Sequence, residues 1–325
     1  MISRREIIAA LLAAASFVPA RLTAQMPPKM LRVGLVGNFP RTAPHYAAFE
    51  KRMAELGYEE GKNFAFEFAQ AKSLEDYQSA FAELAQRKVD IFVAVANEPA
   101  LRAALAAAGT LPIVMLAISF DPFEKGYVAS LARPGGNVTG YFVRQIELAA
   151  KRVELTREAL PKAHTLGLWW DAASRDQAEA AAATARSLGF EPRLIEVTGQ
   201  PPDYAEALGH MAEAPGEPVM IAESGVFLRD RAAILPLLLA RRTPAIAAYR
   251  ELVEAGALLS YGIDLVGLFR DAAGYVDRIA KGAKPADLPI EQPTHFDMAI
   301  NLKTAASLGI ALPPLLTARA DEVIE

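Results

Sequence analysis

The sequence contains no cysteine, and it has only four histidines and two tryptophans among its 325 residues. The absence of cysteine excludes a disulfide-bonded scaffold, and it also excludes membrane attachment through a lipid on cysteine. The chain must therefore be held together by its hydrophobic core. The histidines show no metal-ligand spacing such as HExxH, so we expect neither a metal site nor a cofactor.

Basic clusters and catalytic signatures are missing as well. The net charge is −4, and because the first 24 residues carry +2, the remainder carries −6. A mildly acidic chain without a basic cluster argues against nucleic-acid binding. There is no GxSxG elbow, no P-loop, and no GxGxxG after the first predicted strand. The Pro-Gly-Gly-Asn segment at 134–137 is interpreted as a turn. We therefore do not expect an enzyme.

The first residues have the layout of an export signal. Two arginines near the start are followed by an apolar run over 7–18, and small residues end the segment 1–24. The apolar run is shorter than the about 20 residues that a membrane-spanning helix needs. Cleavage after Ala20 and cleavage after Ala24 both fit, as do general secretory and twin-arginine export. The segment predicts a signal peptide and an exported, periplasmic protein.

Beyond this segment, strand-like and helix-like runs alternate over roughly 300 residues, a length that suggests two lobes. Strands are predicted over 31–36, 64–68, 89–95, 112–116, 138–141, 164–170, 193–197, 218–222 and 257–260. Helices are predicted over 44–56, 74–87, 99–108, 146–160, 174–188, 203–213, 228–240 and 264–281. Two consecutive runs of strand followed by helix predict an α/β protein with two Rossmann-like lobes, each built on a parallel sheet.

Polar and aromatic side chains follow the predicted strands in both halves of the chain. In open parallel sheets, ligands bind beyond the carboxyl ends of the strands. The residues at these positions are Asn38, Phe39, Asn97, Glu98, Ser119, Asp121, Trp170, Asp171, Glu223 and Ser224. Because they come from both halves, they are our candidates for contacts to a solute held between two lobes.

The aromatic candidates have two interpretations each. Side chains alternate along a strand, so we expect Trp169 in the core and Trp170 or Asp171 at the cleft. Tyr249 and Tyr261 flank the region of the 257–260 strand. They form either an aromatic platform for a flat solute or part of the buried scaffold.

The polar candidates also have two interpretations each. Asp121 precedes a proline, and its carboxylate either binds an ammonium group or caps a helix that follows. Asn97 and Ser119 carry the same two interpretations. These residue types therefore indicate a binding cleft without deciding which side chain touches the solute.

Several segments spread along the chain carry a family resemblance. They are 55–63 (ELGYEEGKN), 128–140 (VASLARPGGNVTG), 259–262 (LSYG), 282–289 (GAKPADLP), 301–305 (NLKTA) and 318–324 (ARADEVI). With them the chain resembles the ABC transporter substrate-binding proteins of the type I periplasmic-binding-protein superfamily, in the branch with tryptophan- and tyrosine-binding members. The resemblance covers essentially the whole chain after the predicted signal peptide.

The resemblance implies two lobes joined by three crossovers, near 142, 263 and 286. The first lobe then comprises 25–142 and 264–285, and the second comprises 143–263 and 286–325. It further implies a monomer whose lobes close around a small organic solute, either an amino acid or an aromatic or carboxylate-like compound. The closed form is expected to deliver this solute to the ABC permease subunits of the inner membrane. The alternative is a sensor that presents its bound form to a signalling receptor.

Two loops depart from the family pattern. Relatives often have Asn-Ser-Gly where this chain has Asn38 to Arg41, and Asn-Pro where it has Trp170 and Asp171. Phe39 and Trp170 as stacking walls favour a flat ligand. Arg41 either pairs with a ligand carboxylate or lies on the surface. These departures leave the identity of the solute open.

Overall fold

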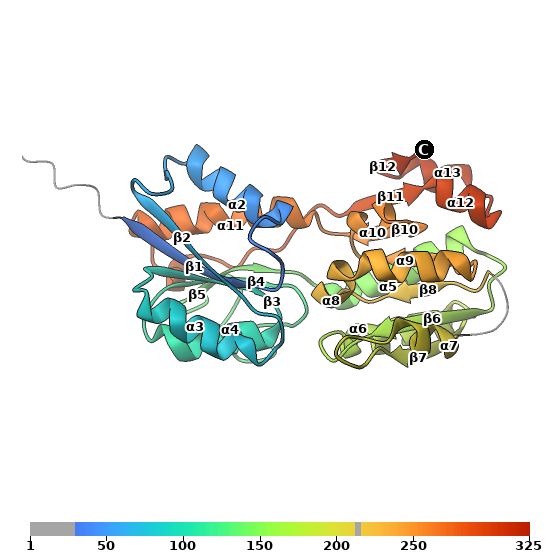
Figure 1. Ribbon diagram of the computed structural model, residues 1–325, viewed down its shortest axis with the longest axis horizontal. Helices are drawn as coiled ribbons and strands as arrows, with labels where there is room; N and C mark the ends of the chain where they lie inside the picture. Colours follow the sequence, from blue (N-terminus) through green and yellow to red (C-terminus); the bar gives the residue numbers. More distant parts are fainter. Residues whose placement is uncertain (1–29, 212–215) are drawn as a thin grey trace, which may run out of the picture. The chain divides into compact units, whose positions relative to one another are not determined.

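The computed structural model describes residues 30–211 and 216–325, and 31–325 form one compact unit. The strands of this unit form two separate sheets, each with its own helices (Figure 1). The predicted α/β fold with two lobes and mainly parallel sheets is confirmed. The predicted signal peptide lies outside the described residues.

The first lobe contains a five-stranded sheet in the order β2-β1-β3-β4-β5, and every pair is parallel. Its strands are β1 (Leu31–Gly37), β2 (Phe64–Gln70), β3 (Ile91–Ala96), β4 (Ile113–Ala117) and β5 (Val138–Phe142). Its helices are α2 (Pro44–Glu55), α3 (Asp76–Gln86), α4 (Glu98–Ala108) and α11 (Leu265–Ala280). Along β3, Val93 packs in the cluster with α2 and α11, whereas Phe92 packs in the cluster with α3 and α4. Side-chain alternation thus buries both faces of the sheet.

The second lobe contains a seven-stranded sheet in the order β12-β11-β10-β9-β8-β6-β7, in which only β10 and β11 pair antiparallel among the described strands. Its strands are β6 (Thr165–Trp170), β7 (Glu191–Glu196), β8 (Val219–Ile221), β9 (Ala245–Ala247), β10 (Leu259–Gly262), β11 (Asp297–Asn301) and β12 (Glu322–Ile324). Helices α5 (Gln145–Ala159), α6 (Arg175–Ser187), α12 (Leu302–Leu308) and α13 (Pro314–Ala318) share one core cluster with the sheet. Helices α7 (Tyr204–Gly209), α8 (Gly225–Arg229), α9 (Arg231–Ala240) and α10 (Arg250–Glu254) share another.

The chain passes between the lobes three times. It enters the second lobe after β5 and returns after β10, and α11 then packs along α2 in the first lobe. Backbone hydrogen bonds from Ile290 to Leu131 and from Glu291 to Gly140, of 2.7 and 2.9 Å, keep the next segment on the first lobe. The third crossover therefore lies between Glu291 and β11, a few residues beyond the position near 286 that the sequence suggested.

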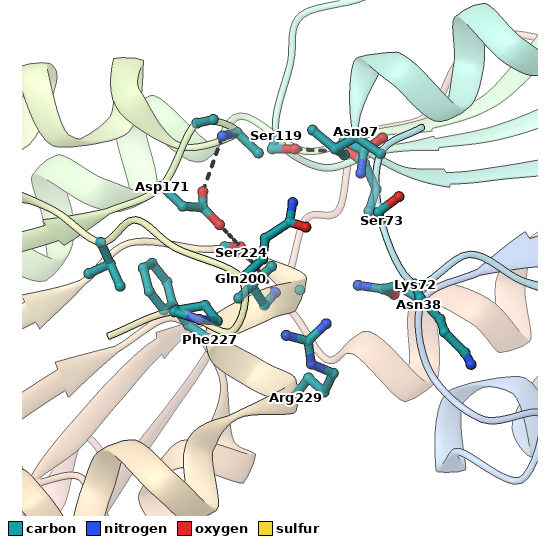
Figure 2. A pocket seen from close by; sticks show the side chains of 18 of the residues that line it. Asn38, Lys72, Ser73, Asn97, Ser119, Asp171, Gln200, Ser224, Phe227 and Arg229 are labelled. Atoms are coloured by element: carbon teal, nitrogen blue, oxygen red, sulfur yellow. Dashed lines mark hydrogen bonds between the residues drawn. The ribbon is translucent and has the colours of Figure 1, made fainter. Parts of the chain in front are cut away.

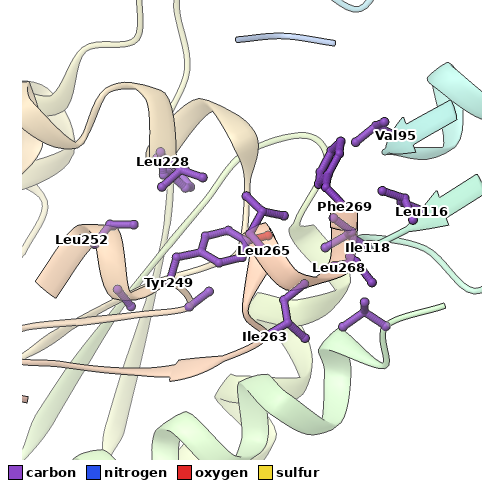
Figure 3. Packing of buried hydrophobic residues seen from close by; sticks show 14 of the residues in the cluster. Val95, Leu116, Ile118, Leu228, Tyr249, Leu252, Ile263, Leu265, Leu268 and Phe269 are labelled. Atoms are coloured by element: carbon purple, nitrogen blue, oxygen red, sulfur yellow. The ribbon is translucent and has the colours of Figure 1, made fainter. Parts of the chain in front are cut away.

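One hydrophobic cluster continues through the crossovers. Val95 and Ile118 at the ends of first-lobe strands belong to the same cluster as Phe269 of α11 and Tyr249 of the second lobe. Figure 3 shows Leu265, in the first turn of α11, between the two sets of side chains. The two sheets are therefore separate, but their apolar cores are not.

Short elements depart from the sequence-based expectations. β9 has three residues and α10 has five, too few for a hydrophobic period to emerge. The helix expected over 228–240 is divided at Asp230 into α8 and α9. Within 30–211 and 216–325, none of the helices is both long and apolar enough to cross a bilayer.

Candidate ligand-binding site

A cavity of about 410 Å³ opens between the carboxyl ends of the two sheets. Its lining comes from the loops after β1, β2, β3 and β4 of the first lobe and after β6, β7 and β8 of the second. In Figure 2, the side chains of the two lobes face each other across this space. Its volume lies within the about 300–1,000 Å³ typical of small-molecule sites.

The first-lobe wall presents mainly neutral polar groups: Asn38, Ser73, Tyr77, Asn97 and Ser119. Asn97 caps α4, because its Oδ1 accepts the N–H of Ala100 at 2.9 Å. Its Nδ2 donates to the Tyr77 hydroxyl at 3.3 Å. Lys72, whose side chain is exposed, contributes the cationic group of this wall. This wall offers amide and hydroxyl hydrogen bonds and one exposed positive charge.

The second-lobe wall is organised around Asp171, which follows β6. Its Oδ1 accepts the Ser174 hydroxyl at 2.8 Å and the Ala173 N–H at 3.1 Å, and its Oδ2 accepts the Ser224 hydroxyl at 2.5 Å. The Ser224 oxygen in turn accepts the N–H of Val226 at 3.1 Å and so caps α8. Three hydrogen bonds therefore hold the Asp171 carboxylate in a single position at the cavity.

Glu223 is the most buried ionisable residue of the lining, with 3% of its surface exposed. Its Oε1 accepts the Tyr249 hydroxyl at 2.8 Å, and its backbone exchanges two hydrogen bonds with the Gln177 side chain. Its Oε2 has no hydrogen-bond partner. Burial raises the pKa of Glu223 to about 7, and the charge of Asp171 adds to this, whereas the Tyr249 hydroxyl and Arg152 act against it.

Arg152 of α5 is wholly buried behind this wall. Its Nη1 donates to the backbone oxygen of Tyr261 at 3.2 Å, and its Nη2 lies 3.5 Å from Oε1 of Gln145. Gln145 follows the first crossover, and Tyr261 precedes the second. Burial lowers the pKa of Arg152 to about 10, and the charge of Glu223 opposes this change. The guanidinium therefore links two crossovers and stays charged at neutral pH.

Comparison with known proteins assigns the family. A family model for the ABC transporter substrate-binding protein matches residues 40–324. The chain belongs to this family. A tyrosine-binding protein from Clostridioides difficile is 25% identical over 268 residues, which cover 81% of this chain and 75% of the relative.

Solved structures agree with the family assignment. One, described as an ABC domain in complex with L-Trp from Streptococcus pneumoniae, is 25% identical with a TM-score of 0.81. Another, a conserved domain protein from Vibrio cholerae, is 25% identical with a TM-score of 0.82. In both comparisons 91% of this chain matches 100% of the other. The resemblance to a type I periplasmic substrate-binding protein is thus confirmed.

Six of the predicted contact residues of this substrate-binding protein line the cavity. They are Asn38, Asn97, Ser119, Asp171, Glu223 and Ser224. All six follow strands whose carboxyl ends meet at the cavity. The rule for parallel sheets therefore brings together residues that are up to 186 positions apart in the chain (Asn38 and Ser224).

The two predicted stacking walls lie elsewhere. Trp170, the last residue of β6, is 9% exposed and packs with Ala178 and Ala222. Phe39 packs against the core with its ring edge-on to His45, the centroids 5.2 Å apart. Neither aromatic ring lines the 410 Å³ cavity.

Charged candidates outside the cavity have local partners. Glu98 accepts the Tyr127 hydroxyl at 2.7 Å. Asp121 accepts two backbone N–H groups at 2.8 and 3.0 Å, but the segment that follows it is a turn and not the expected helix. Arg41 lies on the surface and forms two hydrogen bonds to Glu50. These groups act in local structure, and they do not line the cavity.

The two tyrosine candidates belong to the scaffold around the site. Tyr249 is 3% exposed, and its hydroxyl donates to Glu223, so it supports a cavity residue from behind. Tyr261 is half-buried, and its ring lies 6.1 Å from that of Phe296. Neither tyrosine is among the residues that line the cavity.

The sequence argument missed two lining segments. Residues 71–74 follow β2, and 196–202 follow β7. Phe227 and Arg229 of α8 also line the cavity, and Arg229 forms an ion pair with Asp230. The strand-end rule would have found both segments had it been applied to β2 and β7, each of which is an edge strand of its sheet.

One group of metal-ligand residue types occurs in the described part of the chain, outside the cavity. His295, Asp297 and Asp321 place ligand atoms within 4.8 Å of one another. His295 Nε2 lies 2.9 Å from Asp297 Oδ1, and Asp321 accepts the backbone N–H of Met298 at 2.8 Å. These groups already have protein partners, and His295 is exposed.

Proposed function

We propose that this substrate-binding protein is exported, binds an aromatic amino acid or a closely similar solute between its lobes, and delivers it to an ABC permease without chemical change. The observation that carries the proposal is the cavity between strand ends of both lobes, about 410 Å³ in volume. Polar groups for a zwitterion and apolar side chains such as Leu74, Val197 and Phe227 share its lining.

The family membership and two relatives support this choice of solute. One relative is named a tyrosine-binding protein, and another structure contains L-Trp. Without the stacking walls expected from Phe39 and Trp170, the apolar contacts to a ring come from Leu74, Tyr77 and the Pro201–Pro202 segment. Apolar burial then supplies most of the binding free energy, and the polar groups orient the solute.

The binding test uses the purified chain after unfolding and refolding by dialysis, which removes any solute retained from the cells. Thermal shift and calorimetry are measured with L-tryptophan, L-tyrosine and L-phenylalanine, and with L-leucine and D-glucose as comparison solutes. A solute at 100 times its Kd should add about 2.7 kcal/mol to the free energy of unfolding. The absence of a shift with every amino acid would contradict the proposed ligand class.

A cavity-filling variant locates the site. Ala172 lines the cavity on an exposed turn, so Ala172→Trp narrows the space without touching the core. We expect its affinity for the bound amino acid to fall by at least about 10-fold, since the indole takes the place of the ligand ring. Ala183→Trp, on the exposed side of α6, is the matched control and should bind as the unaltered chain does. Equal affinity of both variants would show that the ligand does not bind in this cavity.

Export and delivery need separate measurements. The mature N-terminus of protein taken from the periplasm, determined by mass spectrometry, should begin after Ala20 or Ala24. Uptake of the labelled solute by cells that lack this chain should fall and should recover on complementation. Normal uptake together with intact binding would contradict delivery and would favour the sensor alternative.

A further inference from the structure

Beside the ligand cavity, the loop after β1 packs against the first turns of α8, so the two lobes touch there. Asn38 and Gly225 line the cavity and also a neighbouring space of about 20 Å³. Phe39 and Leu228 line this smaller space but not the cavity. A space of about 20 Å³ holds about one water molecule. The surfaces of the two lobes are therefore closely packed around it.

Gly225, the first residue of α8, permits this close approach because it has no side chain. A Cβ atom at this position would overlap the amide nitrogen of Asn38 and would lie 3.4 Å from Asn38 Cγ. The φ angle of Gly225 lies outside the left-handed region, so the backbone itself would accept an alanine. The glycine is therefore required by the contact between the lobes and not by the local backbone.

Phe39 supplies the apolar part of the contact. Its half-buried side chain packs against the core cluster that contains Leu228 and Tyr249 of the second lobe. Its ring lies 5.2 Å from that of His45, which in turn lies 4.8 Å from the ring of Phe269 in α11. Figure 3 shows part of this cluster, with Leu228 and Tyr249 toward the second lobe and Phe269 toward the first. Phe39 is thus packed at the junction of the lobes.

A hinge motion of the lobes breaks this contact. Three crossovers join the lobes, and opening separates the strand ends that line the cavity. Opening also exposes the Phe39 ring and the first turns of α8 to water, whereas closure buries them again. The apparent dissociation constant of a solute held between the lobes is the intrinsic constant divided by the fraction of chains that are closed. Residues that stabilise closure therefore raise the affinity without touching the solute.

From this packing we infer that Asn38 and Phe39 of the first lobe and Gly225 and Leu228 of the second form a closure contact, which sets the fraction of closed chains. Phe39 then acts as a positioning residue, and it scales the affinity for every solute by the same factor. The inference rests on the proposed function only in that a solute is held between the lobes. It does not depend on which solute this is.

The first experiment measures closure directly. Because the chain has no cysteine, Gln78→Cys in α3 and Ala183→Cys in α6 place one spin label on an exposed position of each lobe. Double electron–electron resonance then gives the distribution of distances between the labels, with and without a saturating solute. In the ligand-free chain, Phe39→Ser and Gly225→Ala should each move this distribution away from the one that the solute-saturated, otherwise unaltered chain shows.

The second experiment measures affinity by calorimetry with L-tryptophan, L-tyrosine and L-phenylalanine. Phe39→Ser should lower the affinity for every one of these that binds by the same factor, at least about 5-fold, because closure and not a ligand contact is lost. Phe123→Ser, at a phenylalanine of the first lobe that is 56% exposed and does not line the cavity, is the matched control and should bind as the unaltered chain does. A melting temperature for each variant confirms that it is folded.

Gly225→Ala should lower the affinity by at least about 5-fold as well. Gly274→Ala is its control, because a Cβ atom at this position of α11 meets no other atom within 4 Å. The loss caused by Gly225→Ala should be smaller when it is combined with Asn38→Ala, which removes the amide that the new methyl group meets. Equal losses in the two backgrounds would show that Asn38 and Gly225 do not act through their contact.

The outcomes separate this inference from the proposed function. Unchanged distance distributions in Phe39→Ser and Gly225→Ala overturn the inference and leave amino-acid binding intact. A loss of affinity in Phe39→Ser that differs from one amino acid to another makes Phe39 a ligand contact and also overturns it. If none of the three amino acids binds, the proposed ligand class fails. The ligand-free distance distributions of the variants and of the unaltered chain then decide the inference on their own.

Discussion

The two walls of the cavity are built by the same rule but differ in charge. Both place loops at the carboxyl ends of parallel strands. The first lobe presents amides, hydroxyls and one exposed lysine, whereas the second presents carboxylates with a buried arginine behind them. The same rule of fold therefore builds two walls whose side chains differ in charge.

The difference continues beneath the surface of the second lobe. Asp171, Glu223, Tyr249 and Arg152 interact in a buried region that also reaches the crossovers. In the first lobe, the ion pair of Arg32 in β1 with Glu67 in β2 is partly exposed, with 40% of the arginine side chain accessible. The buried charged groups described here therefore lie in the second lobe. We expect substitutions of charged residues there to change the free energy of unfolding more than substitutions in the first lobe.

The largest effect is expected from Arg152→Met. The change removes two buried hydrogen bonds and leaves Glu223 without its nearby positive charge. The free energy of unfolding should fall by about 3 kcal/mol, as measured by urea denaturation at pH 7. Lys151→Met, at the exposed neighbouring position of α5, is the matched control and should change stability far less. Similar losses in both variants would show that the buried charge is unimportant.

A second effect, which depends on pH, is expected from Glu223→Gln. The pKa of Glu223 is raised by burial to about 7, above the value of about 4.3 in an unfolded chain. The folded state therefore holds this proton more tightly, and its contribution to stability is present below pH 4.3 and is lost as the pH rises through 7.

The stability difference between Glu223→Gln and the unaltered chain should accordingly move in favour of the variant by about 3 kcal/mol between pH 4.5 and pH 8. Urea denaturation across this pH range measures the difference. Glu179→Gln, which removes an exposed carboxylate on α6, should show no such trend. A flat difference for Glu223→Gln would mean that Glu223 ionises normally in the folded chain.

The smallest effect is expected from a substitution in the first-lobe wall of the cavity. Asn97→Ala removes the cap of α4 and should lower the free energy of unfolding by about 1 kcal/mol. Asn301 caps α12 in the second lobe with the same geometry but far from the cavity, so Asn301→Ala serves as the comparison. Only Asn97→Ala should also weaken ligand binding in calorimetry. Unchanged affinity would show that Asn97 caps α4 but does not contribute to ligand binding.

Sequence patterns predicted the strand and helix order well because hydrophobic periodicity is local. The alternation of Phe92 and Val93 between two faces follows directly from the strand period. The same order of elements identified Asn38, Asn97 and Asp171 as strand-end residues, since parallel strands bring their carboxyl ends to one edge. Three-residue strands such as β9 carried too little pattern to be found.

Other features depended on contacts that no local pattern reveals. Trp170 and Asp171 are adjacent, yet the first packs into the lobe and the second lines the cavity. Arg152 stands in a helix next to Lys151 and resembles a surface residue in the sequence, although it is wholly buried. Only packing decides between such alternatives, because the partners lie far away in the chain.

The sequence by itself thus determined the two-lobed α/β fold and the strand ends that meet at the cavity, because these follow from short-range periodicity, and its motifs carried the resemblance to the family. The tertiary structure alone decided which side chains reach the cavity and how charge is divided between its walls. The reason is physical. The environment of Asp171 and Glu223 is set by residues 152, 177, 224 and 249, which meet only after the second sheet has formed.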